Sequence, residues 1–182
     1  FFSGRIHELK GAVFLTKIHK ELNAKGLSVT TLMAGEKIHE KKCLNITSEK
    51  INLLGYLPTT EIVKLYRICD LFIFPSNFEI GPNVVLEAKA CRAVCVVSPN
   101  GGGKRIEKSG LDGIIINKLE LNRWVNTVSD LLQNDLKRKK IRDFLIKQQP
   151  MSWKKIFKDD LLVHWERLKR DEEFINPSST SR

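Results

Sequence analysis

The sequence lacks any apolar run long enough to cross a bilayer, since a membrane-spanning helix needs about eighteen such residues. Its first ten residues, FFSGRIHELK, also lack the charged-then-apolar order of a secretory signal. The four cysteines have no C-x2-C spacing, and the four histidines form no H-E-x-x-H motif. We therefore expect a cytoplasmic protein without a bound metal. Because the chain begins at Phe1, within a segment that we predict to be a strand, we also expect it to be a piece of a longer protein.

Two common phosphate-binding motifs are missing as well. The segment GGGKR resembles the end of a Walker A motif, but Ser98 stands where its first glycine is required. Arg105 stands where a serine or threonine should hold magnesium, and no G-x-G-x-x-G follows a strand. Any phosphate that this chain binds must be held by another arrangement.

Acidic residues are too few to balance the basic ones. The chain has 31 lysines and arginines against 21 aspartates and glutamates, which gives a net charge of +10. Such a surplus indicates a polyanionic partner, namely phosphates, an anionic membrane face or nucleic acid, although a solvated lysine-rich surface would look the same. Basic residues are not interleaved with aromatic ones, so we expect no nucleic-acid partner.

Short runs of branched apolar residues alternate with segments of helical period. The runs are LSVTTLMAG, INLLG, LFIFPS, VCVVS and GIIIN. Strands that are apolar on both faces are typical of parallel sheets covered by helices on both sides. We therefore predict an α/β fold, a Rossmann-like doubly wound parallel sheet with C-terminal helices. Residues 1–150 would form this domain, residues 151–174 a C-terminal helix of the same domain that begins at an N-cap on Ser152, and residues 175–182 a disordered tail.

The candidate site lies in the stretch FEIGPNVVLEAKA, residues 78–90, after the strand LFIFP. Gly81 and Pro82 are the expected N-cap and first residue of a helix. Glu79 lies just before this helix and Glu87 in its second turn. Two ionised carboxylates there can accept hydrogen bonds from sugar hydroxyls, while the free N–H groups of the helix face a phosphate. Acids favoured only by the helix dipole are the alternative.

The order of several blocks resembles the retaining glycosyltransferases of the GT-B fold, family 4 in particular. GRIHELKG is similar to a G-R-x4-K-G opening, and LMAGE to a strand followed by a glycine turn. LLGYLPTTEIVKLYRICDLFIFPS and the following E-x7-E pair, Glu79 and Glu87, resemble the central block of that family. PNGGGKRIEKSGLDGIII resembles its double-glycine loop and closing strand. The resemblance covers nearly the whole chain.

The resemblance implies roles for particular residues. Arg5 and Lys10 would clamp the diphosphate of the donor, Glu79 would bind hydroxyls of the transferred sugar, and Glu87 would bind the ribose diol. A surface salt bridge is the alternative for Arg5. The catalytic set would be Arg5, Lys10 and Glu79, without a metal, and the donor-binding set would comprise Gly4, Gly35, Gly55, Tyr56, Leu57, Ile80, Gly81, Pro82, Asn83, Val84 and Glu87.

Two positions depart from the pattern of this family. Arg92 stands where the pattern has a glycine suited to a left-handed helix end, and Arg105 stands where a glutamate often follows the double glycine. Neither departure touches the diphosphate clamp or the glutamate pair.

The resemblance implies that the chain is the C-terminal, donor-binding half of a GT-B enzyme of polysaccharide or glycolipid biosynthesis. That enzyme would transfer a hexose-type sugar, with retention, from a nucleoside diphosphate sugar such as a UDP- or GDP-sugar, and would need no cofactor. Its other partners would be a glycan or lipid-linked acceptor and an N-terminal GT-B domain of the same or another chain. The basic segments 134–147 and 152–170 suit peripheral contact with the inner face of an anionic membrane.

Three other functions stay open. The chain could be a non-catalytic nucleotide-sugar-binding or regulatory subunit of a split transferase, a basic nucleic-acid-binding domain, or a sugar-nucleotide epimerase of the same fold. Salt-sensitive nucleic-acid binding without a response to nucleotide sugars would identify the second of these.

Overall fold

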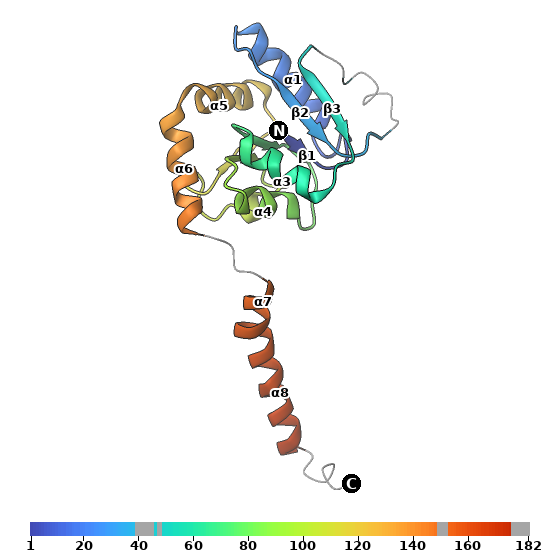
Figure 1. Cartoon of the computed structure of the whole chain (residues 1–182), viewed down its shortest axis with the longest axis vertical. Coiled ribbons are helices and arrows are strands. Elements are labelled where there is room, and N and C mark those ends of the chain that lie inside the picture. The colour runs from blue at the N-terminus through green and yellow to red at the C-terminus, as the bar shows by residue number, and fades with distance from the viewer. Residues whose placement is uncertain (39–45, 47–48, 149–152, 176–182) are drawn as a thin grey trace. The chain divides into compact units, whose positions relative to one another are not determined.

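Six short strands, rich in branched and aromatic residues, run parallel through the first of two units of the chain, Phe1–Gln148 and Gln149–Arg182 (Figure 1). The structure is a computed structural model and describes residues 1–38, 46, 49–148 and 153–175. The strands described are β1 (Phe2–Ser3), β2 (Thr31–Ala34), β3 (Ile51–Gly55), β4 (Phe72–Phe74), β5 (Cys95–Val97) and β6 (Ile114–Ile115). Each of β2 to β6 falls within one of the apolar runs predicted to be strands, and β1 confirms the strand expected at Phe1.

The strands form two three-stranded parallel sheets, β1-β2-β3 and β4-β5-β6. The two sheets adjoin at β1 and β4, where the N–H of Ile73 donates to the carbonyl of Phe1 at 2.9 Å. The order across both sheets is therefore β3-β2-β1-β4-β5-β6, and its direction reverses between β1 and β4. This confirms the doubly wound α/β fold, and ligands of such folds bind beyond the carboxyl ends of the strands at that reversal.

Each described helix of the first unit packs against a neighbouring helix. Their bounds are α1 (Ala12–Ala24), α3 (Thr59–Ile68), α4 (Asn83–Ala90), the 3-10 turn η1 (Gly103–Arg105), α5 (Leu121–Gln133) and α6 (Asp135–Lys147). Helix α1 lies beside α5, where the rings of Phe14 and Trp124 meet edge to face at 5.8 Å, α6 also packs against α5, and α3 lies beside α4 (Figure 1). Right-handed connections between parallel strands place α1 on one face of the strands and α3 and α4 on the other.

Aromatic residues fill the core around β1 and β4, where the two sheets adjoin. Phe2, Phe72 and Phe74 are almost fully buried, and the rings of Phe72 and Phe74 stack with their centres 5.9 Å apart. Tyr66 of α3 contacts both Phe1 and Phe72 edge to face. These contacts join β1 to β4 and thereby fix the two strands whose ends carry the predicted site.

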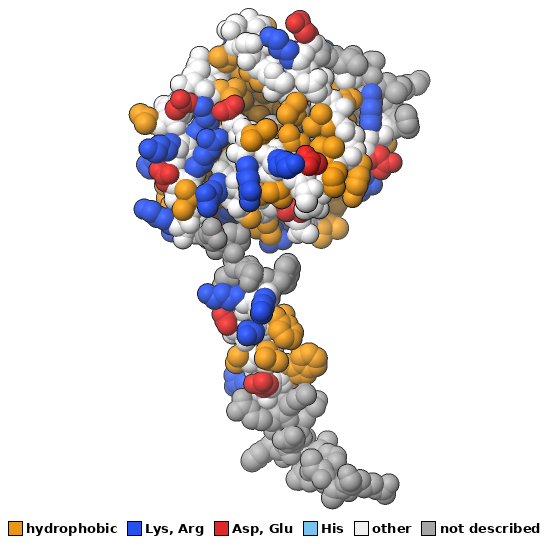
Figure 2. Space-filling model, in the orientation of Figure 1, with side chains coloured by type: hydrophobic (Ala, Val, Ile, Leu, Met, Phe, Trp, Pro, Cys, Tyr) orange, Lys and Arg blue, Asp and Glu red, His pale blue; other side chains and the backbone are white. Residues whose placement is uncertain are grey.

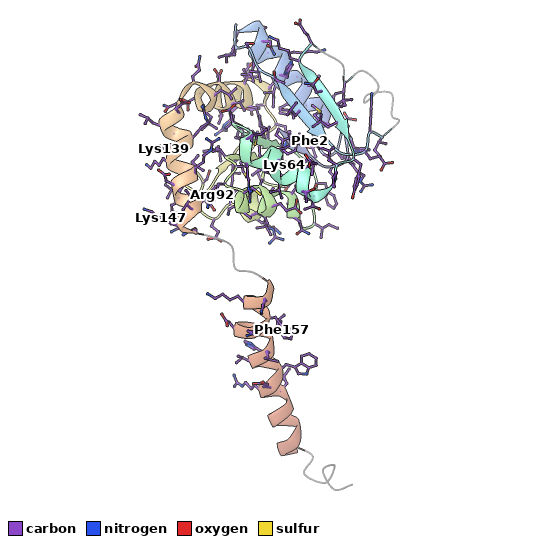
Figure 3. The ribbon with its side chains drawn as sticks, viewed as in Figure 1. Phe2, Lys64, Arg92, Lys139, Lys147 and Phe157 are labelled. Atoms are coloured by element: carbon purple, nitrogen blue, oxygen red, sulfur yellow. The ribbon has the colours of Figure 1, made fainter. Side chains whose placement is uncertain are left out.

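Both ends of helix α4 bear on predictions from the sequence. The helix begins at Asn83, so the prediction of Gly81 as N-cap and Pro82 as first helical residue is wrong by one position. The reason is the backbone of Pro82, whose ψ of 102° is extended and not helical. Beyond the last turn, Arg92 has a φ of 66°, which confirms the left-handed conformation expected there. Figure 3 labels Arg92 near this helix end.

The second unit contains α7 (Trp153–Ile156), a π-helical turn η2 (Phe157–Leu161) and α8 (Leu162–Ile175). Its exposed apolar side chains include Phe157, Leu161, Trp165 and Leu168. The N-cap predicted at Ser152 lies outside the described residues. So does the tail predicted for residues 175–182, except for its first residue, Ile175, which belongs to α8. The assignment of residues 151–174 to the same domain as 1–150 stays a prediction. Among the described helices, none is long and apolar enough to cross a membrane.

Candidate functional site

Two loops meet at the carboxyl ends of β1 and β4, one from Gly4 to Gly11 and one from Pro75 to Pro82. The N–H of Asn77 donates to the carbonyl of Leu9 at 2.8 Å, and the hydroxyl of Ser76 donates to the same oxygen at 3.1 Å. Gly11, with a φ of 84°, packs so closely on Pro75 that a β-carbon there would overlap the proline backbone. The K-G and P-S motifs, far apart in sequence, are thus held against each other.

This contact places Lys10 beside Glu79. The ammonium of Lys10 lies 2.6 Å from Glu79 Oε1, and the two side chains are 25% and 13% exposed. The hydroxyl of Ser76 lies 3.4 Å from the same carboxylate oxygen. The two predicted catalytic residues therefore form a largely buried ion pair that is oriented by the loop around Ser76.

A pocket of about 610 Å³ opens over this ion pair. It contains Arg5, whose exposed guanidinium has no hydrogen bond or ion pair to any of the described residues. The surface salt bridge considered for Arg5 therefore finds no partner in this part of the chain. The residues lining the pocket are Arg5, His7, Leu9, Lys10, Ile38, Phe78, Glu79, Ile80 and Gly81.

The structure thus brings together all three residues of the predicted catalytic set, together with Ile80 and Gly81. Sequence reasoning missed four lining residues, namely His7, Leu9, Ile38 and Phe78. His7 could have been found, because it lies between Arg5 and Lys10 in the G-R-x4-K-G block. Its ring nitrogen Nδ1 accepts a hydrogen bond from the N–H of Leu9 at 3.0 Å, which shapes the loop.

Three glycines of the predicted donor-binding set meet at the ends of β1, β2 and β3. The N–H of Gly4 donates to the carbonyl of Ala34 at 2.9 Å, and the N–H of Gly35 donates to the carbonyl of Gly55 at 2.7 Å. Gly35 has a φ of 140°, and a β-carbon on it would overlap the carbonyl of Gly4. The glycines therefore allow the three loops to approach one another, while the neighbouring Tyr56 stays 86% exposed.

The remaining predicted residues do not line the pocket. Pro82, Asn83 and Val84 lie at the start of α4, directly after Gly81, and Leu57 follows β3. Glu87 is exposed on α4, and its charge adds to the effect of burial in raising the pKa of Tyr66. The structure therefore separates the two glutamates into one at the pocket and one farther along α4.

A buried ion pair holds the loop that contains Gly101, Gly102 and Gly103 against α4. The ammonium of Lys89 donates to the carbonyl of Arg105 at 2.6 Å and to Asp112 Oδ2 at 2.9 Å. The Asp112 carboxylate also accepts from the N–H groups of Glu107 and Lys108, each at 2.9 Å. Burial alone would raise the pKa of Asp112, but Lys89 and these two N–H groups outweigh it, and the pKa lies below its ordinary value.

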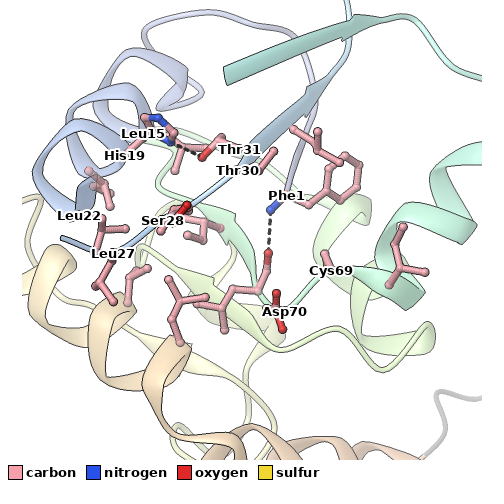
Figure 4. A pocket seen from close by; sticks show the side chains of 18 of the residues that line it. Phe1, Leu15, His19, Leu22, Leu27, Ser28, Thr30, Thr31, Cys69 and Asp70 are labelled. Atoms are coloured by element: carbon pink, nitrogen blue, oxygen red, sulfur yellow. Dashed lines mark hydrogen bonds between the residues drawn. The ribbon is translucent and has the colours of Figure 1, made fainter. Parts of the chain in front are cut away.

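A second cavity, of about 590 Å³, lies at the opposite ends of the strands (Figure 4). His19 is buried at its wall, with Nδ1 2.9 Å from the hydroxyl of Thr31, and the amino group of Phe1 donates to the carbonyl of Leu71 at 2.8 Å. None of the predicted site residues lines it. Its place at the amino ends of β1 and β4 is opposite to where folds of this kind bind ligands.

No group of three or more His, Cys, Asp and Glu side chains suited to a metal ion occurs within the described residues. The absence of a bound metal from the working site stays a prediction. The polar groups that the pocket offers are instead a guanidinium, an ammonium, a carboxylate and an imidazole, a set suited to an anion joined to a hydroxyl-rich group.

Comparison with known proteins gives a consistent set of relatives. Residues 1–148 match the family model described as "Glycosyl transferases group 1". D-inositol 3-phosphate glycosyltransferase of Mycolicibacterium smegmatis is 24% identical over 140 residues, which cover 74% of this chain and 32% of that protein. The chain therefore spans about a third of the length of this relative.

Two solved structures are similar in fold. The C-terminal domain of the glycosyl transferase group 1 family protein LpcC from Francisella tularensis has a TM-score of 0.71 and 18% identity, covering 83% of this chain and 86% of that chain. Anabaena HepE, solved in complex with UDP and glucose, has a TM-score of 0.68 and 19% identity, covering 80% of this chain and 42% of that chain.

Proposed function

The chain belongs to the glycosyl transferases group 1 family, and we propose that it is the donor-binding half of a retaining GT-B glycosyltransferase. The observation that carries this proposal is the meeting of Arg5, Lys10 and Glu79 in one pocket where the strand order reverses. A nucleoside diphosphate sugar, such as a UDP- or GDP-sugar, is the ligand that this set of groups suits. The likeness to a structure solved with UDP and glucose supports the same class of ligand.

In the proposed reaction, Arg5 and Lys10 stabilise the diphosphate as it leaves the sugar. Negative charge builds on that group while the anomeric carbon passes through an oxocarbenium-like state, and two cations near the leaving oxygen lower the barrier. Both cations are side chains, so the proposed step needs no metal. The guanidinium of Arg5, which no described residue pairs with, can bind two phosphate oxygens at once.

Glu79 would accept hydrogen bonds from hydroxyls of the transferred sugar. The ion pair with Lys10, at 2.6 Å, holds the Glu79 carboxylate in place. The backbone from Ile80 to Val84 would contact the sugar and the phosphate, and Glu87 would bind the ribose diol. Gly4, Gly35 and the loop from Gly55 to Leu57 would lie along the nucleotide.

The acceptor would bind to a second, N-terminal GT-B domain of the same or another chain, and this domain would supply part of the attacking machinery. Leaving and attacking groups would lie on the same face of the sugar, which gives retention. Residues 1–148 alone should therefore bind the donor but turn it over slowly. A non-catalytic subunit of a split transferase is the second candidate function. Transferase activity that needs the pocket residues of this chain, measured together with such an N-terminal domain, would favour the donor-binding half over the non-catalytic subunit.

The test is a thermal-unfolding series with UDP-, GDP- and ADP-sugars. A ligand at a hundredfold excess over its dissociation constant should add about 2.7 kcal/mol to the free energy of unfolding, because it binds only the folded state. The nucleoside diphosphates alone serve as controls for the sugar. If no diphosphate sugar raises the midpoint of the folded protein, the proposal fails.

A further inference from the structure

The guanidinium of Arg105 adjoins Gly81, which is one of the residues that line the pocket. Its Nη2 atom lies 3.6 Å from the position that a β-carbon of Gly81 would occupy, and Gly81 lines the pocket. The side chain is half-buried, and none of the described residues forms a hydrogen bond or ion pair with this guanidinium. Arg105 itself does not line the pocket, but through Gly81 it is a third cation next to the site that contains Arg5 and Lys10.

The backbone that carries Arg105 is fixed from three directions. Lys89 binds the carbonyl of Arg105, and the buried Lys89–Asp112 pair ties this carbonyl to the following loop. Gly102 packs on Val85 and Pro82 so tightly that a β-carbon there would meet Val85. The backbone from which the Arg105 side chain extends towards Gly81 is therefore held in a structured turn, η1.

The surroundings of Arg105 favour an added anion. The first turn of α4 contains no acidic residue, and no side chain accepts a hydrogen bond at its N-cap. The free N–H groups of a helix start carry partial positive charge, so a guanidinium beside them is repelled unless an anion lies between. A half-buried cation without a counter-ion also loses hydration without compensation. Both effects are relieved when a ligand supplies a negative group at Gly81.

The position of Arg105 along the pocket indicates which negative group this is. In the proposed function, Arg5 and Lys10 bind the diphosphate, Glu79 binds the transferred sugar, and the backbone that begins at Ile80 contacts both. Arg105 adjoins Gly81, which is two residues from Glu79, and we therefore assign it to the sugar end. We propose that Arg105 determines donor specificity by binding a carboxylate on the transferred sugar, so that the preferred donor is a nucleoside diphosphate glycuronic acid. This inference rests on the proposed function.

A carboxylate suits the chemistry of Arg105. The planar guanidinium offers two parallel N–H groups that match the two oxygens of a carboxylate, and such a paired hydrogen bond is strong and directional. A neutral sugar has only a hydroxymethyl group at the same carbon and leaves the guanidinium unpaired. The preference for the acidic sugar then comes from a cation that is already in place before the donor binds.

The experiment measures binding by calorimetry with two matched ligand sets: UDP, UDP-glucose and UDP-glucuronate, and GDP, GDP-mannose and GDP-mannuronate. The set whose free diphosphate binds the wild type is followed further. Arg105→Gln should lower the affinity for the acidic donor about tenfold, because one hydrogen bond to a charged group is lost. The affinities for the neutral donor and for the free diphosphate should not change. Lys104→Gln, an equal change of charge at the exposed neighbouring residue, is the control and should affect none of them.

The outcomes separate the inference from the proposed function. A wild type that binds neutral and acidic donors equally, or prefers the neutral one, overturns the inference and leaves the proposed function standing. If Arg105→Gln lowers the affinities for all three ligands equally, the inference is also overturned, because Arg105 then binds the phosphates. Failure of the folded wild type to bind any diphosphate overturns both. Thermal unfolding of each variant checks that it is folded.

Discussion

At the scale of single residues, the ion pair of Lys10 and Glu79 is what separates two roles that look alike in the sequence. Glu79 and Glu87 are eight positions apart and were expected to flank one helix start. The structure buries Glu79 against Lys10 at 2.6 Å and leaves Glu87 exposed on α4. A carboxylate tied to a cation at the pocket suits the sugar, whereas an exposed one suits a ligand group farther from the anomeric carbon.

Substitution of each glutamate therefore has a different expected result. Glu79→Gln should weaken binding of the sugar nucleotide by about 1.5 to 3 kcal/mol, or roughly tenfold to a hundredfold, because a charged hydrogen-bond acceptor for the sugar is lost. The same substitution should not weaken binding of the bare nucleoside diphosphate, because Lys10 loses its ion-pair partner and becomes free to bind phosphate. Calorimetry with both ligands measures the two affinities.

Glu87→Gln provides the matched comparison. If Glu87 binds the ribose diol, its substitution should lower the affinities for the sugar nucleotide and for the bare diphosphate by similar factors. A purely structural role would instead lower the unfolding temperature and leave both affinities of the folded protein unchanged. Equal weakening of both ligands by Glu79→Gln would refute the assignment of Glu79 to the sugar.

At the scale of elements, the Lys89–Asp112 pair fixes the glycine-rich loop to α4. The two side chains are 14% and 2% exposed, so the pair is buried, and Asp112 also caps two backbone N–H groups. Removal of one member of a buried pair leaves the other charge without compensation. The loop that carries Arg105 consequently depends on Asp112 for its position.

We predict that Asp112→Asn lowers the free energy of unfolding by about 3 kcal/mol at neutral pH, in the range measured for broken buried pairs. Because the folded pKa of Asp112 lies below its ordinary value, its contribution is present above that ordinary value. The contribution is lost as the pH falls through the folded pKa. Denaturant unfolding of both proteins from pH 7 to acid should show the difference between them shrinking below about pH 4, near the ordinary aspartate value.

The control for this prediction is an exposed pair in the same domain. Glu61 and Lys64 on α3 are 47% and 68% exposed and lie 2.8 Å apart. Glu61→Gln should cost at most about 1 kcal/mol, as surface pairs do. A loss at Asp112→Asn no larger than this would mean that the buried pair does not hold the loop.

The sequence predicted the sheet and much of the pocket because both depend on local patterns. Apolar runs ending in G-R or P-S place Arg5, Lys10 and Glu79 after β1 and β4, and parallel strands bring such ends together. The position of Arg105 could not be predicted, because it follows from the contact of Gly102 with Val85 and the bond of Lys89 to the Arg105 carbonyl. Side chains that act across such long-range contacts leave no periodic signal.

At the scale of the whole molecule, the excess of positive charge gathers on part of the surface. Lys139 and Lys147 project from the outer side of α6 (Figure 3), and basic side chains are grouped over this side of the first unit (Figure 2). Apolar side chains lie among them, since Leu136 is 79% and Ile146 45% exposed. Leu111, Leu136, Lys139, Lys140, Asp143, Phe144 and Lys147 surround a shallow pocket there. A mixed basic and apolar surface of this kind suits an anionic membrane face.

We predict that the protein sediments with vesicles containing anionic lipid and less with neutral vesicles. Replacing Lys139, Lys140 and Lys147 together by glutamine should weaken binding to anionic vesicles by about 3 kcal/mol, at about 1 kcal/mol for each basic residue near the surface. The control replaces Lys17, Lys20 and Lys64, which are exposed on α1 and α3, and should retain the affinity. Equal sedimentation with neutral and anionic vesicles would contradict the prediction.

The pairing of Lys10 with Glu79 also has a consequence for how the domain folds. The two residues are separated by 69 positions, and the strands that position them, β1 and β4, meet only across the join between the two sheets. Contacts between distant segments require the closure of a long loop and form more slowly than contacts within a hairpin or helix. The pocket is therefore expected to form late in folding, after α1 and α3 and after the pairing of β1 with β2. A chain emerging from the ribosome acquires this pocket only after Glu79 and the residues around it have been synthesised.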